Sequence, residues 1–258
     1  MSSKLWSNSR DERLKAARAL SEDEIKRIHT DLERDCPVDV WPYGSPTTIN
    51  PMLLTLGLSP GASPFKGDVE YSIRTPFEMP PAGRPHPKVY YKDPRKYWYS
   101  VRKLAIQILA QDSLSDEDSL ALFGHVNLDT EASGAAKHVQ INARYARWVL
   151  LNIRNHLRPR ILICLGLSGY FKDNPKVANL FEENFSGLKL RCPHRRYELE
   201  SYQRKKYWFK EWDIVCQHGN KVRIVLWPQH PVRSPMTNEE VWRGACEQFS
   251  RRASELFR

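Results

Sequence analysis

Two short segments carry the residue types that acid–base chemistry needs. Residues 57–68, GLSPGASPFKGD, contain three glycines and two prolines and end in Asp68. Residues 227–235, WPQHPVRSP, place His230 and Arg233 among three prolines. Glycine lets a backbone approach a ligand closely and proline stiffens a loop, so each segment can hold a reactive side chain in a fixed place. A carboxylate and an imidazole facing one crevice could act on one substrate, although each segment alone is more typical of an ordinary structural loop.

Metal and nucleotide-triphosphate chemistry find little support in the sequence. No GKS or GKT phosphate-binding loop and no H-E-x-x-H helix is present. The five cysteines are scattered and form no C-x-x-C pair, which argues against a zinc site, an iron–sulfur cluster or a disulfide framework. We therefore expect no metal and no cofactor.

Alternating strands and helices must position the two segments. Apolar runs predict strands at residues 52–56, 120–128 and 161–165, and a hairpin formed by 207–215 and 222–227. Apolar residues at helical spacing predict helices within 11–35, 101–109 and 137–157, one that opens at Asn174–Pro175, and a last one that opens at a Thr237–Glu240 capping box. This alternation is typical of an α/β fold with a mainly parallel sheet covered by helices on both faces. Ligands bind such sheets beyond the carboxyl ends of the strands, where both segments begin.

The chain divides at a proline-rich loop. We interpret residues 1–46 as an N-terminal helical extension packed on the core, and 47–258 as one domain with insertions at 62–95 and 186–212. No apolar run reaches the ~20 residues of a membrane helix, and the first residues lack the apolar core of a signal peptide. We therefore expect a cytoplasmic protein with no membrane contact, and nothing points to an obligate protein partner.

The charge balance favours a polyanionic partner. The chain has 40 basic and 30 acidic side chains, a formal charge of +10. Residues 191–210 combine seven Lys or Arg with five aromatic residues, and residues 88–99 are similar. Phosphate-binding cations next to stacking aromatics are typical of DNA contacts, and a plain solvated face is the alternative for each run. The candidate DNA-binding residues here are Arg195, Arg196, Lys205 and Lys206.

In order along the chain, these features resemble the uracil-DNA glycosylase superfamily. Gly57-Leu58-Ser59-Pro60-Gly61 matches its first motif, a strand followed by a G-x-x-P-G-like loop. His230-Pro231 and, after an extra spacing, Ser234-Pro235 match its H-P-S-P-like second motif. The resemblance spans residues 52–257, with LFGHVNLD and ILICLG as intervening strands. It implies a three-layer helix–sheet–helix fold with a mainly parallel four-stranded central sheet, and excision of a base flipped out of DNA.

The resemblance also assigns roles. Ser59 occupies the position where members often carry a carboxylate or amide, while Phe65-Lys66-Gly67-Asp68 resembles an F-T-G-like turn that precedes a catalytic aspartate in one branch. Asp68 is therefore the favoured base, with Asp129 in reserve, and His230 would stabilise the departing base. Asn127 would read the base edge. The remaining assignments are stacking by Phe65 and Tyr71, close backbone approach at Gly57 and Gly61, and DNA contacts from Arg233 and Ser234.

The excised base is left open. Uracil-selective members can place a tyrosine just after the first motif's proline, where this chain has Gly61, so a wider pocket is expected. The function implied is hydrolysis of the N-glycosidic bond of uracil or a modified pyrimidine, in DNA repair. One alternative is an antiviral glycosylase specific for hypermodified cytosine in phage DNA. Another is a DNA-binding protein on a glycosylase fold that has lost catalysis.

Overall fold

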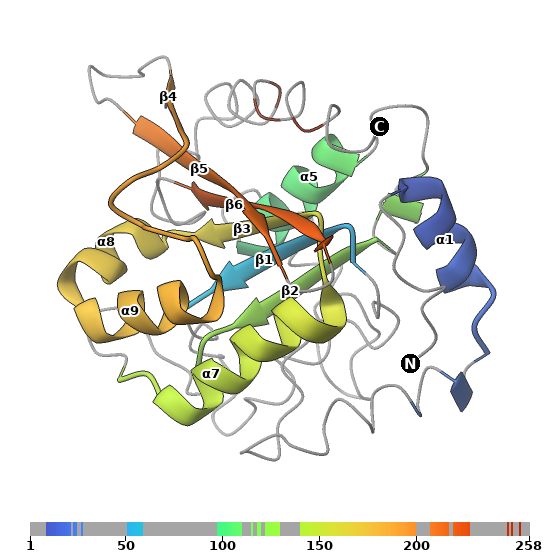
Figure 1. Ribbon diagram of the computed structural model, residues 1–258. Helices are drawn as coiled ribbons and strands as arrows, with labels where there is room; N and C mark the ends of the chain where they lie inside the picture. The colour runs from blue at the N-terminus through green and yellow to red at the C-terminus, as the bar shows by residue number, and fades with distance from the viewer. Residues whose placement is uncertain are drawn as a thin grey trace, which may run out of the picture.

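A six-stranded sheet organises the part of the chain that the structure describes (Figure 1). The computed structural model describes residues 9–21, 23–24, 27, 51–58, 97–109, 115, 118–119, 122–129, 140–199, 207–216, 219–227, 247, 249 and 253. The strands are β1 (Leu53–Gly57), β2 (Phe123–Asn127), β3 (Ile161–Leu165), β4 (Arg195–Leu199), β5 (Tyr207–Val215) and β6 (Lys221–Trp227). Their order is β2-β1-β3-β6-β5-β4.

The sheet is mixed and mainly parallel. Strands β2, β1, β3 and β6 run parallel, whereas β5 pairs antiparallel with both β6 and β4. The prediction of an α/β fold with a mainly parallel sheet is confirmed, but the sheet has six strands instead of four. The hairpin of β5 and β6 is present as predicted, and β4 extends it by one further strand.

Helices cover both faces of the sheet (Figure 1). The described helices are α1 (Arg10–Arg18), α5 (Tyr97–Leu109), α7 (Ala143–Asn152), α8 (Leu167–Asp173), α9 (Pro175–Asn184) and the π-helix η3 (Ile153–Leu157). Residues of α7 and α9 share one apolar core with alternate strand residues such as Leu54 and Leu162, and residues of α1 and α5 share the other with Leu53 and Ile163. Every residue of β1, β2 and β3 is buried, as expected for strands covered on both sides.

Most predicted helix boundaries have identifiable local causes. Helix α7 begins at Ala143, later than predicted, because the Asn142 side chain accepts hydrogen bonds from the backbone N–H groups of Arg144 and Tyr145. The helical segment ends at Leu157, just before Pro159, as predicted. Its last turn is a π-helix, in which the Arg158 N–H donates to the Ile153 carbonyl over 2.9 Å.

Of two further helix caps predicted from the sequence, one is confirmed and the other makes a different hydrogen bond. The Ser21–Glu24 capping box is confirmed, since the N–H of Ser21 donates to the Glu24 carboxylate over 2.9 Å. Asn174 precedes Pro175 at the start of α9 as predicted, but its side-chain amide donates to the carbonyl of Tyr170 instead of capping α9. The Thr237–Glu240 capping box lies outside the described residues. Within the described part of the chain, no helix is long and apolar enough to cross a membrane.

Candidate functional site at the carboxyl edge of the sheet

The four parallel strands end at one edge of the sheet. Gly57, the last residue of β1, is in register with Asn127, the last residue of β2. Leu165 and Trp227 end β3 and β6 in register with each other. The two sequence segments singled out above therefore both begin at this carboxyl edge, where open α/β sheets bind ligands.

Three buried polar side chains form a row on β1 and β2, pointing to the face that α5 covers. Thr55 lies opposite His125, one step before the Gly57–Asn127 pair. The exposed fractions of Thr55, His125 and Asn127 are 0%, 3% and 5%. The Thr55 hydroxyl lies 2.9 Å from Nδ1 of His125, and Nε2 of His125 lies 3.2 Å from Oδ1 of Asn127. Buried polar groups are costly unless they are hydrogen-bonded, and this row satisfies the requirement internally.

The Asn127 amide fixes the proton on one nitrogen of His125. The amide oxygen of Asn127 can only accept, so His125 donates to it from Nε2. In a neutral ring Nδ1 is then an acceptor. The Thr55 hydroxyl lies 2.9 Å from this nitrogen and 3.3 Å from the carbonyl oxygen of Gly124, so its single proton has two acceptors within reach.

Gly57 provides the space that the Asn127 side chain occupies. A Cβ atom built on Gly57 would lie 2.3 Å from Oδ1 of Asn127 and 3.3 Å from Cε1 of His125. The first separation is far inside van der Waals contact, and both neighbours belong to buried side chains held by hydrogen bonds. Any larger residue at position 57 would therefore displace the amide.

A buried carboxylate lies at the same edge of the sheet. Asp129 follows β2 by two residues and is 2% exposed. Burial and, secondly, the negative charge of Asp129 raise the pKa of the Tyr170 hydroxyl on α8. Since α8 begins directly after β3, Tyr170 and Asp129 add a phenol and a carboxylate to the same edge. Among the described residues, no three His, Cys, Asp or Glu side chains are grouped so as to hold a metal ion.

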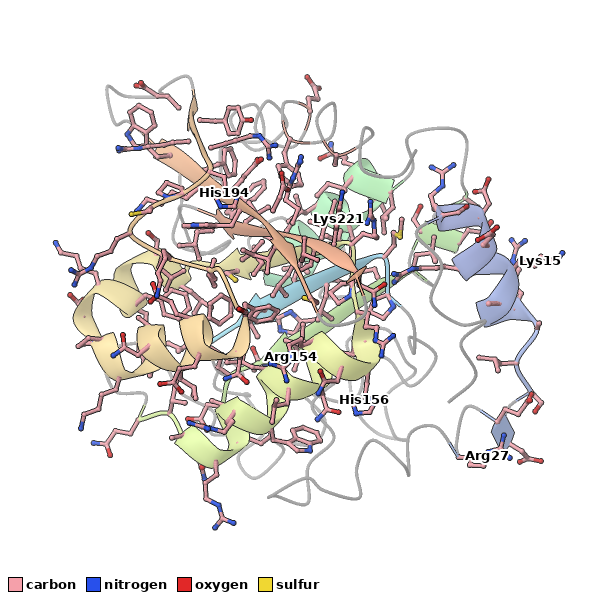
Figure 2. The ribbon with its side chains drawn as sticks, viewed as in Figure 1. Lys15, Arg27, Arg154, His156, His194 and Lys221 are labelled. Carbon is pink, nitrogen blue, oxygen red and sulfur yellow. The ribbon has the colours of Figure 1, made fainter. Side chains whose placement is uncertain are left out.

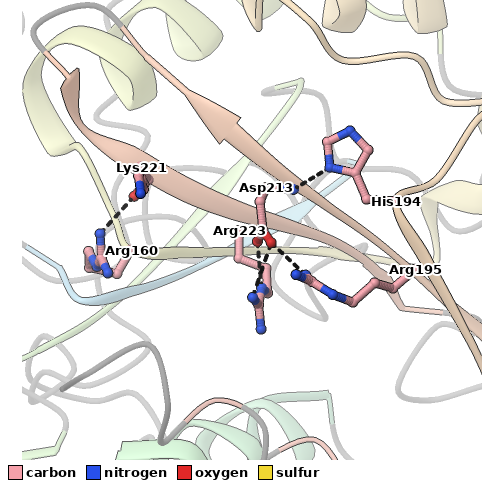
Figure 3. A network of polar contacts seen from close by, with 6 residues as sticks. All are labelled: Arg160, His194, Arg195, Asp213, Lys221 and Arg223. Atoms are coloured by element: carbon pink, nitrogen blue, oxygen red, sulfur yellow. Dashed lines mark hydrogen bonds and ion pairs between the residues drawn. The ribbon is translucent and has the colours of Figure 1, made fainter.

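The β4–β5 hairpin carries a second group of charges, which are paired (Figure 3). The Asp213 carboxylate accepts from Arg195 over 2.5 Å and from Arg223 over 2.7 and 3.2 Å. Burial raises the pKa of Asp213, but the hydrogen bonds and charges of Arg223 and Arg195 outweigh it, so the pKa lies below its ordinary value. Of the predicted DNA contacts, Arg195 is thus held in an ion pair.

Arg196, the next residue, faces the other side of the hairpin. Its guanidinium carbon lies 4.0 Å from the centre of the Trp208 ring, a cation–π contact. Lys210 lies directly opposite Arg196 across the strand pair. Arg196 is exposed, and Trp208 and Lys210 are half-buried. We call these three residues, Arg196, Trp208 and Lys210, the hairpin surface.

The structure brings together part of the predicted site. Gly57 and Asn127 are paired in register, and Asp129 lies at the same edge. The predicted residues outside the described part of the chain are Ser59, Gly61, Phe65, Asp68, Tyr71, Lys205, Lys206, His230, Arg233 and Ser234. The sequence analysis missed Thr55 and His125. Their signal was available, since each is a polar residue inside an otherwise apolar strand, and His125 is two residues from Asn127 and so on the same face.

Comparison with known proteins gives no family assignment: no protein-family model matches the chain, and no curated protein matches it.

Proposed function

We propose that the protein is a DNA glycosylase that hydrolyses the N-glycosidic bond of a flipped-out uracil or modified pyrimidine and leaves an abasic site. One observation carries the proposal. Asn127 and Gly57 are in register at the carboxyl edge, His125 hydrogen-bonds the Asn127 amide, and this amide occupies the space that a Cβ atom on residue 57 would take. An amide can read a base edge by hydrogen bonding. A fixed, nearly buried amide at a ligand-binding edge suits that role.

The strand arrangement supports the same proposal. The parallel strands β2-β1-β3-β6, with helices on both faces, fit the helix–sheet–helix fold that the sequence resemblance implies. The motif segments at 57–68 and 227–235 begin at the ends of β1 and β6. Because both strands end at one edge, the roles proposed for Asp68 and His230 require no rearrangement of the sheet.

The proposed reaction needs charges of two signs. The bond between C1′ and the base nitrogen breaks with its electron pair on the base. Water adds to C1′ as a hydroxyl group that keeps one proton. The second water proton passes to the general base, and the departing base anion takes up one proton from solvent. A carboxylate near the sugar stabilises the cationic centre and orients the water, and a donor near the base stabilises the anion. We assign these roles to Asp68 and His230, and base recognition to Asn127.

A serine hydrolase is the competing enzyme class, because Gly57–Gly61 also has the G-x-S-x-G spacing of a nucleophile elbow. In such elbows the backbone N–H of the residue after the serine contributes to the oxyanion hole. Here that residue is Pro60, which has no N–H. The glycosylase therefore remains the better proposal.

The test is formation of abasic sites in oligonucleotides that carry uracil, 5-hydroxymethylcytosine or glucosylated 5-hydroxymethylcytosine, detected by alkaline strand cleavage. We expect product from at least one substrate. Asn127→Ala and His230→Ala should each lower the single-turnover rate by about 100-fold, the usual size of a lost transition-state contact. DNA binding without any abasic product would instead identify a protein that retains only the binding function.

A further inference from the structure

We propose that His125 is a positioning residue that makes Asn127 a hydrogen-bond donor toward the ligand, and that the site therefore selects a pyrimidine of the cytosine class, whose N3 carries no proton. The inference rests on the proposed glycosylase function and deepens it by naming the substrate class. It uses only residues of β1 and β2.

The oxygen of the Asn127 amide is already engaged. Oδ1 accepts from Nε2 of His125 at 3.2 Å. On its other side it lies over Gly57, in the place that a Cβ atom would take, 2.3 Å from the ideal Cβ position. A ligand therefore finds this oxygen enclosed between an imidazole and a backbone carbon.

The nitrogen of the same amide remains for the ligand. Asn127 is 5% exposed, and its Nδ2 donates no hydrogen bond to any residue that the structure describes. An amide is planar, so when Oδ1 faces His125 the two N–H bonds of Nδ2 point away from it. The amide therefore has its donors, and not its acceptor, left for a ligand.

His125 determines this orientation. Its Nε2 proton faces Oδ1 at 3.2 Å, and the Thr55 hydroxyl lies 2.9 Å from Nδ1, where it can donate to a ring that carries its proton on Nε2. Without that proton, the amide could turn by half a rotation and present its oxygen instead. Thr55 and His125 thus act on the ligand through Asn127 without touching it.

An amide donor discriminates between base edges. N3 of cytosine has a lone pair that can accept from one N–H of Asn127, whereas uracil and thymine carry a proton on N3. A donor facing the N3–H of uracil leaves two polar hydrogens unsatisfied in a buried site, which costs roughly 10- to 100-fold in rate. The C5 substituent does not enter this argument, so the expected preference holds for cytosines modified at C5.

The experiment compares 5-hydroxymethylcytosine with 5-hydroxymethyluracil, which differ only on the edge that Asn127 would read. Each base is placed opposite the same abasic analogue in one duplex, so that no partner base contributes, and single-turnover rates are measured. We expect the full chain to favour the cytosine by at least about 10-fold. His125→Phe, which keeps a ring but removes the donor, should reduce this ratio toward one. Asn127→Asp, which can only accept from N3–H, should reverse it.

A matched pair at position 55 controls for packing. Thr55→Val keeps the shape but removes the hydroxyl and should reduce the ratio, whereas Thr55→Ser keeps the hydroxyl and should retain it. A readout without turnover is the ¹⁵N NMR spectrum of the histidine rings, in which His125 should be protonated at Nε2. A uracil preference, a ratio unchanged in His125→Phe, or protonation at Nδ1 alone would overturn the inference. Absence of product from both bases and also from the uracil and glucosylated substrates above would instead overturn the proposed function, and the ring protonation would still decide the role of His125.

Discussion

The contact between Gly57 and Asn127 makes a strong prediction about a single methyl group. In Gly57→Ala the new Cβ atom would meet Oδ1 of Asn127 at 2.3 Å. Overpacking of this kind typically costs about 1–3 kcal/mol of unfolding free energy. We expect glycosylase activity to fall by about 100-fold as well, because a displaced amide no longer meets the base edge. Chemical denaturation and the abasic-site assay measure the two effects.

The matched control is Gly169→Ala on α8. Gly169 is exposed, and a Cβ atom there would meet no atom within 4 Å. Alanine in a helix is favoured over glycine by roughly 0.5–1 kcal/mol, so this variant should be unchanged or slightly more stable, with full activity. If Gly57→Ala were as stable and active as Gly169→Ala, the Gly57–Asn127 contact would have no functional importance.

At the residue scale, part of the site was predictable. Gly57 and Asn127 stand at the ends of apolar runs, so their place at a strand end follows from local pattern alone. Their pairing depends on β1 and β2 being neighbours in register, which joins residues 70 positions apart, as it does for Thr55 and His125. Local periodicity carries no information about such pairing, and this is why His125 was not identified as a site residue.

At the scale of elements, the Asp213 ion pairs should tie the stability of the hairpin to pH. The folded-state pKa of Asp213 lies below its ordinary value of 3.8, so its stabilising contribution is complete above that value and is lost as the pH falls through it. Asp213→Asn should therefore lower the unfolding free energy by a constant amount above about pH 5, and the difference from the unmodified protein should disappear in acid. Urea denaturation at several pH values measures this. A difference that persists in acid would assign the loss to packing.

The hairpin surface predicts how DNA binding depends on salt. Arg196 and Lys210 face each other across β4 and β5, and like charges in this position destabilise a strand pair unless an anion lies between them. If both contact phosphates, Arg196→Ala with Lys210→Ala should reduce the slope of log K against log salt by about 1.8. Trp208→Ala should weaken binding to single strands by about 1–3 kcal/mol through loss of stacking.

A control with the same change in charge uses Lys15→Ala and Lys176→Ala. Both lysines are exposed, and Lys15 lies on α1, well away from His194, which directly precedes β4 (Figure 2). This pair should leave the salt slope nearly unchanged, as judged by fluorescence anisotropy. Equal slopes for the two double variants would mean that the hairpin surface has no specific contact with DNA.

The elements differ in how far their sequences predict them. Strand β3 has the predicted bounds because ILICL is uniformly apolar, and the hairpin turn has Gly219 at φ 76°, a conformation that glycine favours. Strand β4 was missed because RRYEL is mostly polar, as suits an outer strand whose order comes from pairing with β5. Helix α8 was missed because Gly166 reads as a turn that closes β3, whereas at φ 68° it begins α8 directly.

For the whole molecule, a single arginine connects α1 to the amino end of the sheet. The Arg13 guanidinium donates to the carbonyl of Pro51 over 2.7 Å and to that of Arg158 over 2.9 Å. Burial and the charge of Arg160 lower the pKa of Arg13 to about 9, so its charge opposes folding at every pH below that value. The two hydrogen bonds must more than offset this penalty if Arg13 stabilises the fold.

We predict that they do. Arg13→Met should lower the unfolding free energy by about 1–3 kcal/mol, because the loss of two charge-assisted hydrogen bonds exceeds the relief of burying a cation. Lys15→Met, on the exposed side of the same helix, should change it by less than about 0.5 kcal/mol. Denaturant titration compares the two. An Arg13→Met protein that is more stable than the unmodified one would show that burial of the charge dominates.

The layered architecture was the most predictable property at this scale. Alternating apolar strands and helices can bury their apolar faces in few ways, and nearly uniformly apolar strands such as β1 and β3 require cover on both faces. Strand order does not follow from these patterns. It depends on which of many similar apolar surfaces pack together, so the insertion of β1 between β2 and β3 had to come from the structure.

Strand β4 ends the sheet and, in the described part of the chain, pairs on one side only. An open strand of this kind can recruit the same strand from another copy and start aggregation. Arg195 and Arg196 place two adjacent cations on it, on opposite faces of the sheet. A second copy approaching this border would meet positive charge from either face, so the charges that we assign to ion pairing and to DNA also discourage self-association.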